Sequence, residues 1–349
     1  MQRRMIYLAT NIGWFGQYSG YDPLIPQVRR ADPTAPVDVV CVQPGWSSRC
    51  RGKLLSIYKG FGAAPQEYVA ALHRLKVALA ADGHSVGHIL NGEEALPYLD
   101  LFPDSVLQRL VFTFHQPRAL WTPAMEQAVT RISHALVLYS RDQDYLSGFT
   151  RRRPHVLLLG ADTEFFRPPP VLPTGPPSLL YSGVHLRDTD MLFRVLQKLH
   201  ARGVNARLNF LVPKAHPARR GLEAKFHGMQ VNWLSGLGDA QLLALYQSST
   251  LMLLPLVDSG ANTAVVEALS CGLPLVTTNV GGIPDYGGGT VFPTVEPDDD
   301  ERMADLVGVY LSDAGQRQAI SQKQREFAVS RMAWPHSVTE HLKFYTSVL

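Results

Sequence analysis

The chain has few cysteines, little net charge and no long apolar run, and each absence excludes a class of protein. Its cysteines, Cys41, Cys50 and Cys271, are odd in number and lack the spacing of a metal site, so we expect reduced thiols. The formal net charge of +3 over 349 residues argues against a nucleic-acid-binding protein with a large basic field. No stretch approaches the ~20 apolar residues of a membrane span, and the first apolar run is too short for a signal peptide. We therefore expect a soluble, cytoplasmic protein.

The composition is otherwise that of a folded globular protein. Hydrophobic residues make up 46% of the chain and charged residues 18%, and the length suffices for two domains with separate cores. Short apolar runs alternate with stretches of helical periodicity in both halves of the chain. This alternation predicts two doubly wound, Rossmann-like α/β domains that face each other across a cleft.

The most informative stretch runs from residue 250 to residue 285. Residues 250–256 form a continuous apolar run, which is typical of a parallel strand buried on both faces. A helix is expected to begin at Asn262 or Thr263, both good N-cap residues, and to end at Gly272, before Pro274. Residues 275–278 predict the next strand, which completes a βαβ unit.

The loop before this helix has the composition of an anion site. Asp258, Ser259 and Gly260 are small or polar, and the free N–H groups of a helix N-terminus at the end of a strand favour phosphate. Glu267 follows one turn into the helix, from where its carboxylate could reach the hydroxyls of a bound sugar. Spacing alone leaves an ordinary Rossmann-like crossover with a solvated Glu267 equally open.

The order of residues from Glu267 onward resembles a known signature. The sequence Glu-Ala-Leu-Ser-Cys-Gly-Leu-Pro-Leu-Val is similar to the donor site of the retaining GT-B glycosyltransferases of the Glu-x7-Glu family, which is family 4-like, or group 1. The resemblance implies that Glu267 binds the ribose of a nucleotide-sugar donor. It also implies that the N–H groups of Asn262, Thr263 and Ala264 bind phosphate or hexose. Ser259 stands where the family's first Glu contacts the transferred sugar.

A glycine-rich loop follows the first predicted strand, residues 5–10. Family members have a loop here between the donor phosphate and the acceptor, which implies that Gly16 lies on the donor side. The aromatic residues Trp14, Tyr18 and Tyr21 are then expected on the acceptor side. A plain βα loop, with glycines for turn geometry, is the alternative.

A strand predicted over residues 110–114 ends at His115. A histidine at the carboxyl end of a strand can bond a sugar hydroxyl, although taken alone such a residue is more often structural. Residues 113–115, Thr-Phe-His, resemble the family's Thr-x-His, which implies that His115 orients the donor sugar.

The C-terminal half offers candidate cations for the donor diphosphate. Gly183 ends the strand predicted over residues 178–183, and Val184 replaces the arginine that usually follows in the family. Arg187 is then the nearest cation able to bridge phosphate oxygens. Lys214, after the strand predicted over residues 208–212, is a second candidate for the diphosphate or base, with a solvated loop residue as the alternative.

Two further donor-side residues come from the resemblance. Trp233 lies in the strand predicted over residues 231–236, whose end approaches the nucleotide base in the family. Gly160 lies in residues 156–168, which resemble the Asn-Gly-Val-Asp-x-x-x-Phe-x-Pro segment that closes the family's N-terminal domain. Gly160 is therefore expected to face the site.

The resemblance also sets the expected domain boundaries. We expect an acceptor-side domain over residues 1–168, a proline-rich linker over residues 169–177 and a nucleotide-sugar-binding domain over residues 178–330. Residues 331–349 should form a helix that crosses back to the first domain.

A locally basic region contains Arg49, Arg51, Lys53 and Lys59. It indicates either a groove for an anionic or lipid-phosphate acceptor or a solvated face, and the solvated face is the simpler interpretation. A peripheral membrane contact through the N-terminal domain is compatible with the first interpretation.

The sequence thus predicts a retaining glycosyltransferase with a nucleotide-sugar donor and a small-molecule, glycan or lipid-linked acceptor. His115, Arg187 and Lys214 would act in catalysis, and the resemblance implies no required metal or other cofactor. Two alternatives stay open. One is a GT-B nucleotide-sugar epimerase, and the other is a catalytically degraded nucleotide-sugar-binding protein, which the missing first Glu and the missing arginine after Gly183 would favour.

Overall fold

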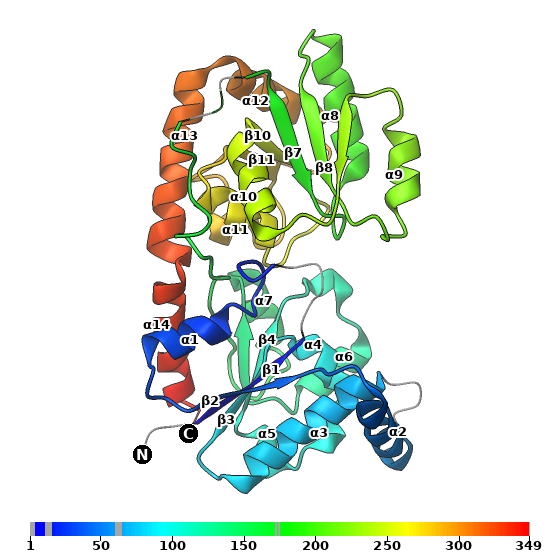
Figure 1. Cartoon of the computed structure of the whole chain (residues 1–349), viewed down its shortest axis with the longest axis vertical. Helices are drawn as coiled ribbons and strands as arrows, with labels where there is room; N and C mark the ends of the chain where they lie inside the picture. The colour runs from blue at the N-terminus through cyan, green and yellow to red at the C-terminus, as the bar shows by residue number, and fades with distance from the viewer. Residues whose placement is uncertain (1–3, 11–15, 60–64, 172, 174, 349) are drawn as a thin grey trace. The chain divides into compact units, whose positions relative to one another are not determined.

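The computed structural model describes residues 4–10, 16–59, 65–171, 173 and 175–348, with the side chains of residues 57–59 excepted. These residues form two compact units (Figure 1). The first contains residues 4–10 together with the described parts of 21–158 and 335–348. The second contains residues 16–20 and the described parts of 159–334.

The first unit is built on a six-stranded parallel sheet. Its strands are β1 (Met5–Ala9), β2 (Val37–Cys41), β3 (Val86–Ile89), β4 (Leu110–Phe114), β5 (His134–Val137) and β6 (His155–Val156). They are ordered β2-β1-β3-β4-β5-β6. The chain moves outward to β2 and then returns past β1 to β3, so the topological switch point of this sheet lies between β1 and β3.

Helices cover this sheet and bury its apolar residues. They are α1 (Leu24–Ala31), α2 (Trp46–Lys59), α3 (Gln66–Ala81), α4 (Gly92–Ala95), η1 (Leu96–Leu101), α5 (Asp104–Leu107), η2 (Arg118–Leu120), α6 (Pro123–Val129), α7 (Ser140–Leu146) and α14 (Trp334–Thr346). The helix predicted from residue 65 is present as α3, which buries Leu72 and Leu75 against the core, while α2 packs on α3 (Figure 1).

The second unit repeats this plan with a second six-stranded parallel sheet. Its strands are β7 (Ser178–Ser182), β8 (Arg207–Leu211), β9 (Val231–Leu234), β10 (Leu251–Leu254), β11 (Leu275–Thr278) and β12 (Thr294–Val295). The order β12-β11-β10-β7-β8-β9 is that of a Rossmann dinucleotide-binding sheet. Its switch point lies between β7 and β10.

The helices of the second unit alternate with its strands. They are α8 (Thr189–Ala201), α9 (Arg219–Lys225), α10 (Asp239–Ser248), α11 (Thr263–Ser270), η3 (Ile283–Tyr286), α12 (Asp300–Ser312), α13 (Ala314–Phe327) and η4 (Ala328–Met332). The predicted βαβ unit is β10-α11-β11, and β10 is buried over its whole length between β7 and β11.

Gly272 ends α11 as the sequence predicts. It has φ +60°, its N–H donates to the carbonyl of Leu269, and the N–H of Leu273 donates to that of Ala268. This pair of bonds is a Schellman motif, which requires a residue that tolerates the left-handed conformation. The motif turns the chain directly into β11.

The chain passes from the first unit to the second between Leu158 and Leu159, before the proline-rich stretch. Ala161 bridges to Ala333, and a Cβ on Gly160 would meet the ring of Trp334 at 2.3 Å. Residues 159–168 therefore pack with the second unit, because the close approach of this backbone to Trp334 fixes them there.

Candidate functional site

The switch point of the second sheet collects the polar residues that the sequence singles out. Gly183 directly follows β7, and the loop of residues 258–262 connects β10 to α11. Adjacent parallel strands that connect in opposite directions leave a crevice at their carboxyl ends, where Rossmann-like sheets bind ligands. Sequence and topology thus point to the same edge of this sheet.

Arg187 is held at this edge by three hydrogen bonds. Its Nε donates to the carbonyl of Ser182 at 2.9 Å, one terminal nitrogen donates to the carbonyl of His185 at 3.1 Å, and the other to Oδ1 of Asn262 at 3.2 Å. None of the ion pairs found among the described residues includes Arg187. Burial lowers the pKa of this guanidinium, which nevertheless stays charged. A positioned cation without an acidic partner is suited to an anionic ligand.

The N-terminus of α11 adds backbone donors beside Arg187. Asn262 occupies the N-cap position, but its side chain makes no capping bond and instead accepts from Arg187. The first turn, which contains Thr263 and Ala264, therefore has no side-chain cap. Uncapped N–H groups and the positive end of the helix dipole form an anion site.

The loop before α11 is fixed by bonds within itself and by a glycine. Ser259 is buried, its N–H donates to Asp258 Oδ1 at 2.7 Å, and its hydroxyl donates to the carbonyl of Gly260 at 3.0 Å. Gly281 has φ +50°, and a Cβ there would lie 1.9 Å from the carbonyl oxygen of Ser259. Ser259 therefore presents a short hydroxyl that donates to the neighbouring backbone, at the position where the resembled family signature has a glutamate carboxylate.

Glu267 lies on α11 with its carboxylate buried. Ser19 donates to Oε1 at 2.6 Å and Tyr246 donates to Oε2 at 2.7 Å. Burial raises the pKa of Glu267 to about 7, and the two hydrogen bonds oppose that rise. The carboxylate is thus partly neutralised near neutral pH, and both oxygens are engaged by protein hydroxyls.

Residues 16–20 pack near Glu267 in the second unit, against α10 and Phe165. A Cβ on Gly16 would clash with the carboxylate of Asp239, and the N–H of Gln17 donates to that carboxylate at 3.3 Å. The ring of Tyr18 stacks on Phe165 with 3.8 Å between ring centroids. Gly16 and Tyr18 therefore lie beside α10 and residue 165. Trp14 lies outside the described residues.

Lys214 follows β8, which pairs with β7, and Trp233 lies in β9, which pairs with β8. Lys214 is exposed, and its backbone N–H donates to Ser235 Oγ at 3.3 Å. The ring of Trp233 stacks on Phe210 and carries the guanidinium of Arg219 4.6 Å above it. The Trp233 side chain is therefore engaged in packing, whereas Lys214 is exposed.

In the first unit, His115 follows β4 beside the switch point of that sheet. Its Nε2 donates to the carbonyl of Leu90 at 2.7 Å, and its backbone N–H donates to Glu93. The ring of Tyr21 packs edge-on against the ring of His115, with 5.3 Å between the ring centroids. Because Nε2 is a donor, the neutral ring offers Nδ1 as an acceptor.

Tyr21 is buried in a polar network inside the first unit. Its hydroxyl lies 2.6 Å from His341 Nε2, and Thr113 donates to it at 3.3 Å. His88 links Thr113 to Tyr345, each at 2.7 Å. These contacts tie α14 to the first sheet, so the Tyr21 hydroxyl has a structural role here, while its ring contacts His115.

Two groups of the predicted residues thus come together. Gly183, Arg187 and the loop and helix start at residues 258–264 come together at the second switch point, whereas Gly16 and Glu267 come together around α10. Gly160 is packed on Trp334. Sequence reasoning missed Ser19 and Tyr246 as partners of Glu267. Ser19 lies in the glycine-rich loop and Tyr246 ends the apolar pattern of α10, but neither carried a signal for a carboxylate.

A metal-binding cluster and a membrane-spanning helix are both absent from the described residues. Among them, no three His, Cys, Asp or Glu side chains lie close enough to hold a metal ion. No helix in the part of the chain that the structure describes is long and apolar enough to cross a membrane.

Two Rossmann-like units, each with a six-stranded parallel sheet, define the GT-B class of fold. Residues 176–313 match the family model described as "Glycosyl transferases group 1". This match lies within the second unit, whose fold and switch point are described above.

Curated relatives resemble only part of this chain. It is 24% identical over 212 residues to "MMP alpha-(1->4)-mannosyltransferase" of Mycolicibacterium hassiacum, which covers 56% of this chain and 48% of the relative. It is 25% identical over 236 residues to "D-inositol 3-phosphate glycosyltransferase" of Corynebacterium urealyticum, covering 65% of this chain and 48% of the relative. The aligned region thus spans about half the length of these relatives.

Solved structures resemble the whole fold. Sucrose-phosphate synthase of Thermosynechococcus elongatus aligns with a TM-score of 0.77 at 16% identity and covers 99% of both chains. Anabaena HepE in complex with UDP and glucose aligns with a TM-score of 0.72 at 14% identity, covering 99% of this chain and 100% of that one. At these identities the likeness establishes the fold.

Proposed function

We propose that the protein transfers a sugar from a nucleoside-diphosphate sugar to a hydroxyl of an acceptor, with retention of the anomeric configuration. The observation that carries the proposal is the anion site at the second switch point. There, Arg187, which forms no ion pair with any described residue, lies beside the N-terminus of α11, which has no side-chain cap. The match of residues 176–313 to the model of group 1 glycosyl transferases supports the reaction class.

In the proposed reaction, the bond between the anomeric carbon and the diphosphate oxygen breaks while the acceptor oxygen bonds to that carbon. The acceptor proton passes to a phosphate oxygen of the donor. Negative charge grows on the leaving diphosphate, and Arg187, Lys214 and the α11 N–H groups stabilise it electrostatically. Because these groups supply the positive charge, we expect turnover to be unchanged by a chelator.

Glu267 would bind the donor's ribose, and this role requires a rearrangement of hydrogen bonds. Both of its oxygens accept from Ser19 and Tyr246. A ribose hydroxyl would replace the Ser19 hydroxyl on Oε1 or share that oxygen with it. Donor binding would then loosen the contact between residues 16–20 and α11.

Uridine diphosphate sugars are the first donors to test, because HepE of Anabaena was crystallised with UDP and glucose. The test is the melting temperature of the purified protein against a panel of nucleoside diphosphates and nucleotide sugars. A ligand that binds only the native state raises this temperature by mass action. A shift with one base, followed by transfer to an acceptor, supports the proposal.

The same panel separates the two alternatives. Conversion of the donor sugar to its epimer without an acceptor would identify an epimerase. Donor binding without turnover on any acceptor would indicate a degraded binding protein. No shift with any nucleotide would contradict the proposed donor site.

The acceptor side includes a surface suited to an anionic membrane. Trp46 is 83% exposed and Leu54 69% exposed on α2, whose described side chains include Arg49, Arg51 and Lys53 and no acid. Apolar and cationic side chains on one helix favour anionic lipid surfaces. We expect co-sedimentation with phosphatidylglycerol vesicles but not with phosphatidylcholine vesicles, and Trp46→Ala should reduce it. Equal sedimentation with both kinds of vesicle would contradict the membrane contact and favour the interpretation of α2 as a solvated face.

A further inference from the structure

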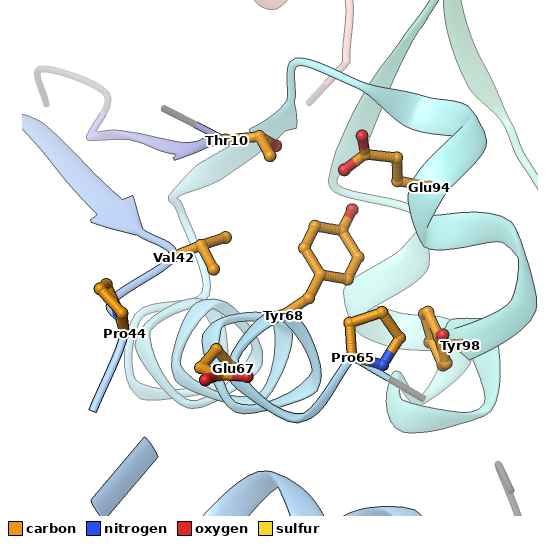
Figure 2. A pocket seen from close by; sticks show the side chains of 8 residues that line it. All are labelled: Thr10, Val42, Pro44, Pro65, Glu67, Tyr68, Glu94 and Tyr98. Carbon is orange, nitrogen blue, oxygen red and sulfur yellow. The ribbon is translucent and has the colours of Figure 1, made fainter. Parts of the chain in front are cut away.

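The first unit contains a cavity of about 530 Å³ at the carboxyl edge of its sheet (Figure 2). This volume is in the range of small-molecule pockets, about 300–1,000 Å³. The lining residues follow β1 and β2, begin α3, and belong to α4 and η1. They are Thr10, Val42, Pro44, Pro65, Glu67, Tyr68, Glu94 and Tyr98.

Tyr68 supplies a polar group that lacks a partner. It is 6% exposed, and its hydroxyl is buried without a hydrogen bond to any described residue. Figure 2 shows this hydroxyl pointing from α3 into the cavity, toward the side where Thr10 and Glu94 lie. A buried hydroxyl left unpaired costs about 1–3 kcal/mol, so a ligand that bonds to it recovers this cost.

The charged side chains that line the cavity are acidic. The side chains of Glu67 and Glu94 line it, and the described residues that line it include no Lys, Arg or His. Desolvation, with the neighbouring Glu93, raises the pKa of Glu94. Arg49 contacts Glu67 with 2.5 Å between Nε and Oε1, and its guanidinium is engaged there. Carboxylates accept hydrogen bonds from hydroxyl or ammonium groups and repel anions.

We propose that this cavity binds the acceptor, as a polyhydroxylated ligand that carries neither phosphate nor carboxylate. Tyr68 bonds one of its hydroxyls and Glu94 accepts from another. The half-buried ring of Tyr98 and the apolar Val42 and Pro65 contact its carbon face. A phosphorylated acceptor would bring a dianion beside two carboxylates, and Arg49, the cation next to them, is already paired with Glu67. The identification of this ligand as the acceptor rests on the proposed function, whereas the inferred chemical class of the ligand does not.

The experiment is isothermal titration of the intact protein, without donor, with three probes. These are methyl α-D-glucopyranoside, D-glucosamine and D-glucose 6-phosphate. We expect the neutral and amino sugars to bind, and the phosphate to bind at least about 10-fold more weakly, a difference of about 1.4 kcal/mol. Equal or tighter binding of the phosphate, or binding of none of the three, would overturn the proposal.

Two variants test the named side chains. Tyr68→Phe removes only the hydroxyl and should weaken binding of the neutral sugar by about 5- to 10-fold. Glu94→Gln should reduce the discrimination against the phosphate. Tyr310→Phe, on α12 in the second unit, is the matched hydroxyl deletion and should leave sugar binding unchanged. If Tyr68→Phe binds like the wild type, the assignment is wrong.

Binding of UDP, measured in parallel, separates this inference from the proposed function. UDP binding with no sugar binding would overturn the cavity's role and leave the transferase proposal intact. Sugar binding with no nucleoside diphosphate binding would support the ligand class and contradict the transferase.

Discussion

Glu267 keeps its carboxylate in a buried position, which is energetically unfavourable. A carboxylate buried on a helix is disfavoured unless hydrogen bonds compensate, and here Ser19 and Tyr246 compensate only in part. The sequence predicted that this residue would face ligand hydroxyls. It could not predict burial, because that depends on residues 16–20, which are distant in the chain.

Glu267→Gln should therefore stabilise the protein at alkaline pH. The pKa of Glu267 is raised from 4.5 to about 7, so the folded state binds more protons than the unfolded state between these values. Stability is then lost as pH rises through this window, by about 3 kcal/mol. The variant should lack this loss in denaturant titrations at pH 5 and pH 8, and should bind UDP more weakly. Parallel pH profiles for the two proteins would contradict this account of the carboxylate.

His115→Ala should lower kcat by about 10²-fold while changing UDP affinity little, since the histidine is expected to act on the sugar rather than the nucleotide. The substitution also frees the carbonyl of Leu90, so a small loss of stability should accompany it. Steady-state kinetics and UDP titration measure the two effects. Unchanged turnover would leave His115 with a structural role alone.

At the scale of elements, α11 was the most predictable part of the fold. Its apolar run, its N-cap residue and Gly272 gave both ends, and the structure confirms them. The local pattern could not reveal that Asn262 gives its side chain to Arg187 instead of capping the helix. That choice depends on a contact between Arg187, in the loop after β7, and Asn262, in the loop after β10, and it leaves the helix N-terminus without a side-chain cap.

The Gly183→Ala variant tests whether the turn after β7 positions Arg187. Gly183 has φ +83°, and a Cβ there would lie 3.3 Å from a terminal nitrogen of Arg187. We expect a loss of about 1–2 kcal/mol of stability from the left-handed backbone. The shifted guanidinium should also weaken UDP binding. Gly203 has φ +74° and open space around it. Gly203→Ala is therefore the matched control, which should lose a similar amount of stability and keep its UDP affinity. Equal UDP affinity in both variants would show that Gly183 serves the turn only.

At the scale of the whole molecule, strand and helix alternation predicted both α/β units, which the structure confirms. The donor-binding role of the residues in the family signature stays a prediction. The order of strands was not predictable from local pattern, because it depends on which strands pair. That order places the switch point of the second sheet at Gly183 and the 258–262 loop. The cavity at Tyr68 and Glu94 was missed because its residues come from separate segments with no shared motif.

The central claim is that the second switch point binds a diphosphate, and titration of UDP into wild type and Arg187→Gln tests it most directly. Charge-assisted hydrogen bonds contribute about 1.5–3 kcal/mol, so the variant should bind UDP about 10- to 100-fold more weakly. Uridine affinity should be equal in both, since uridine lacks the phosphates. UDP affinity unchanged by the loss of Arg187 would contradict the account.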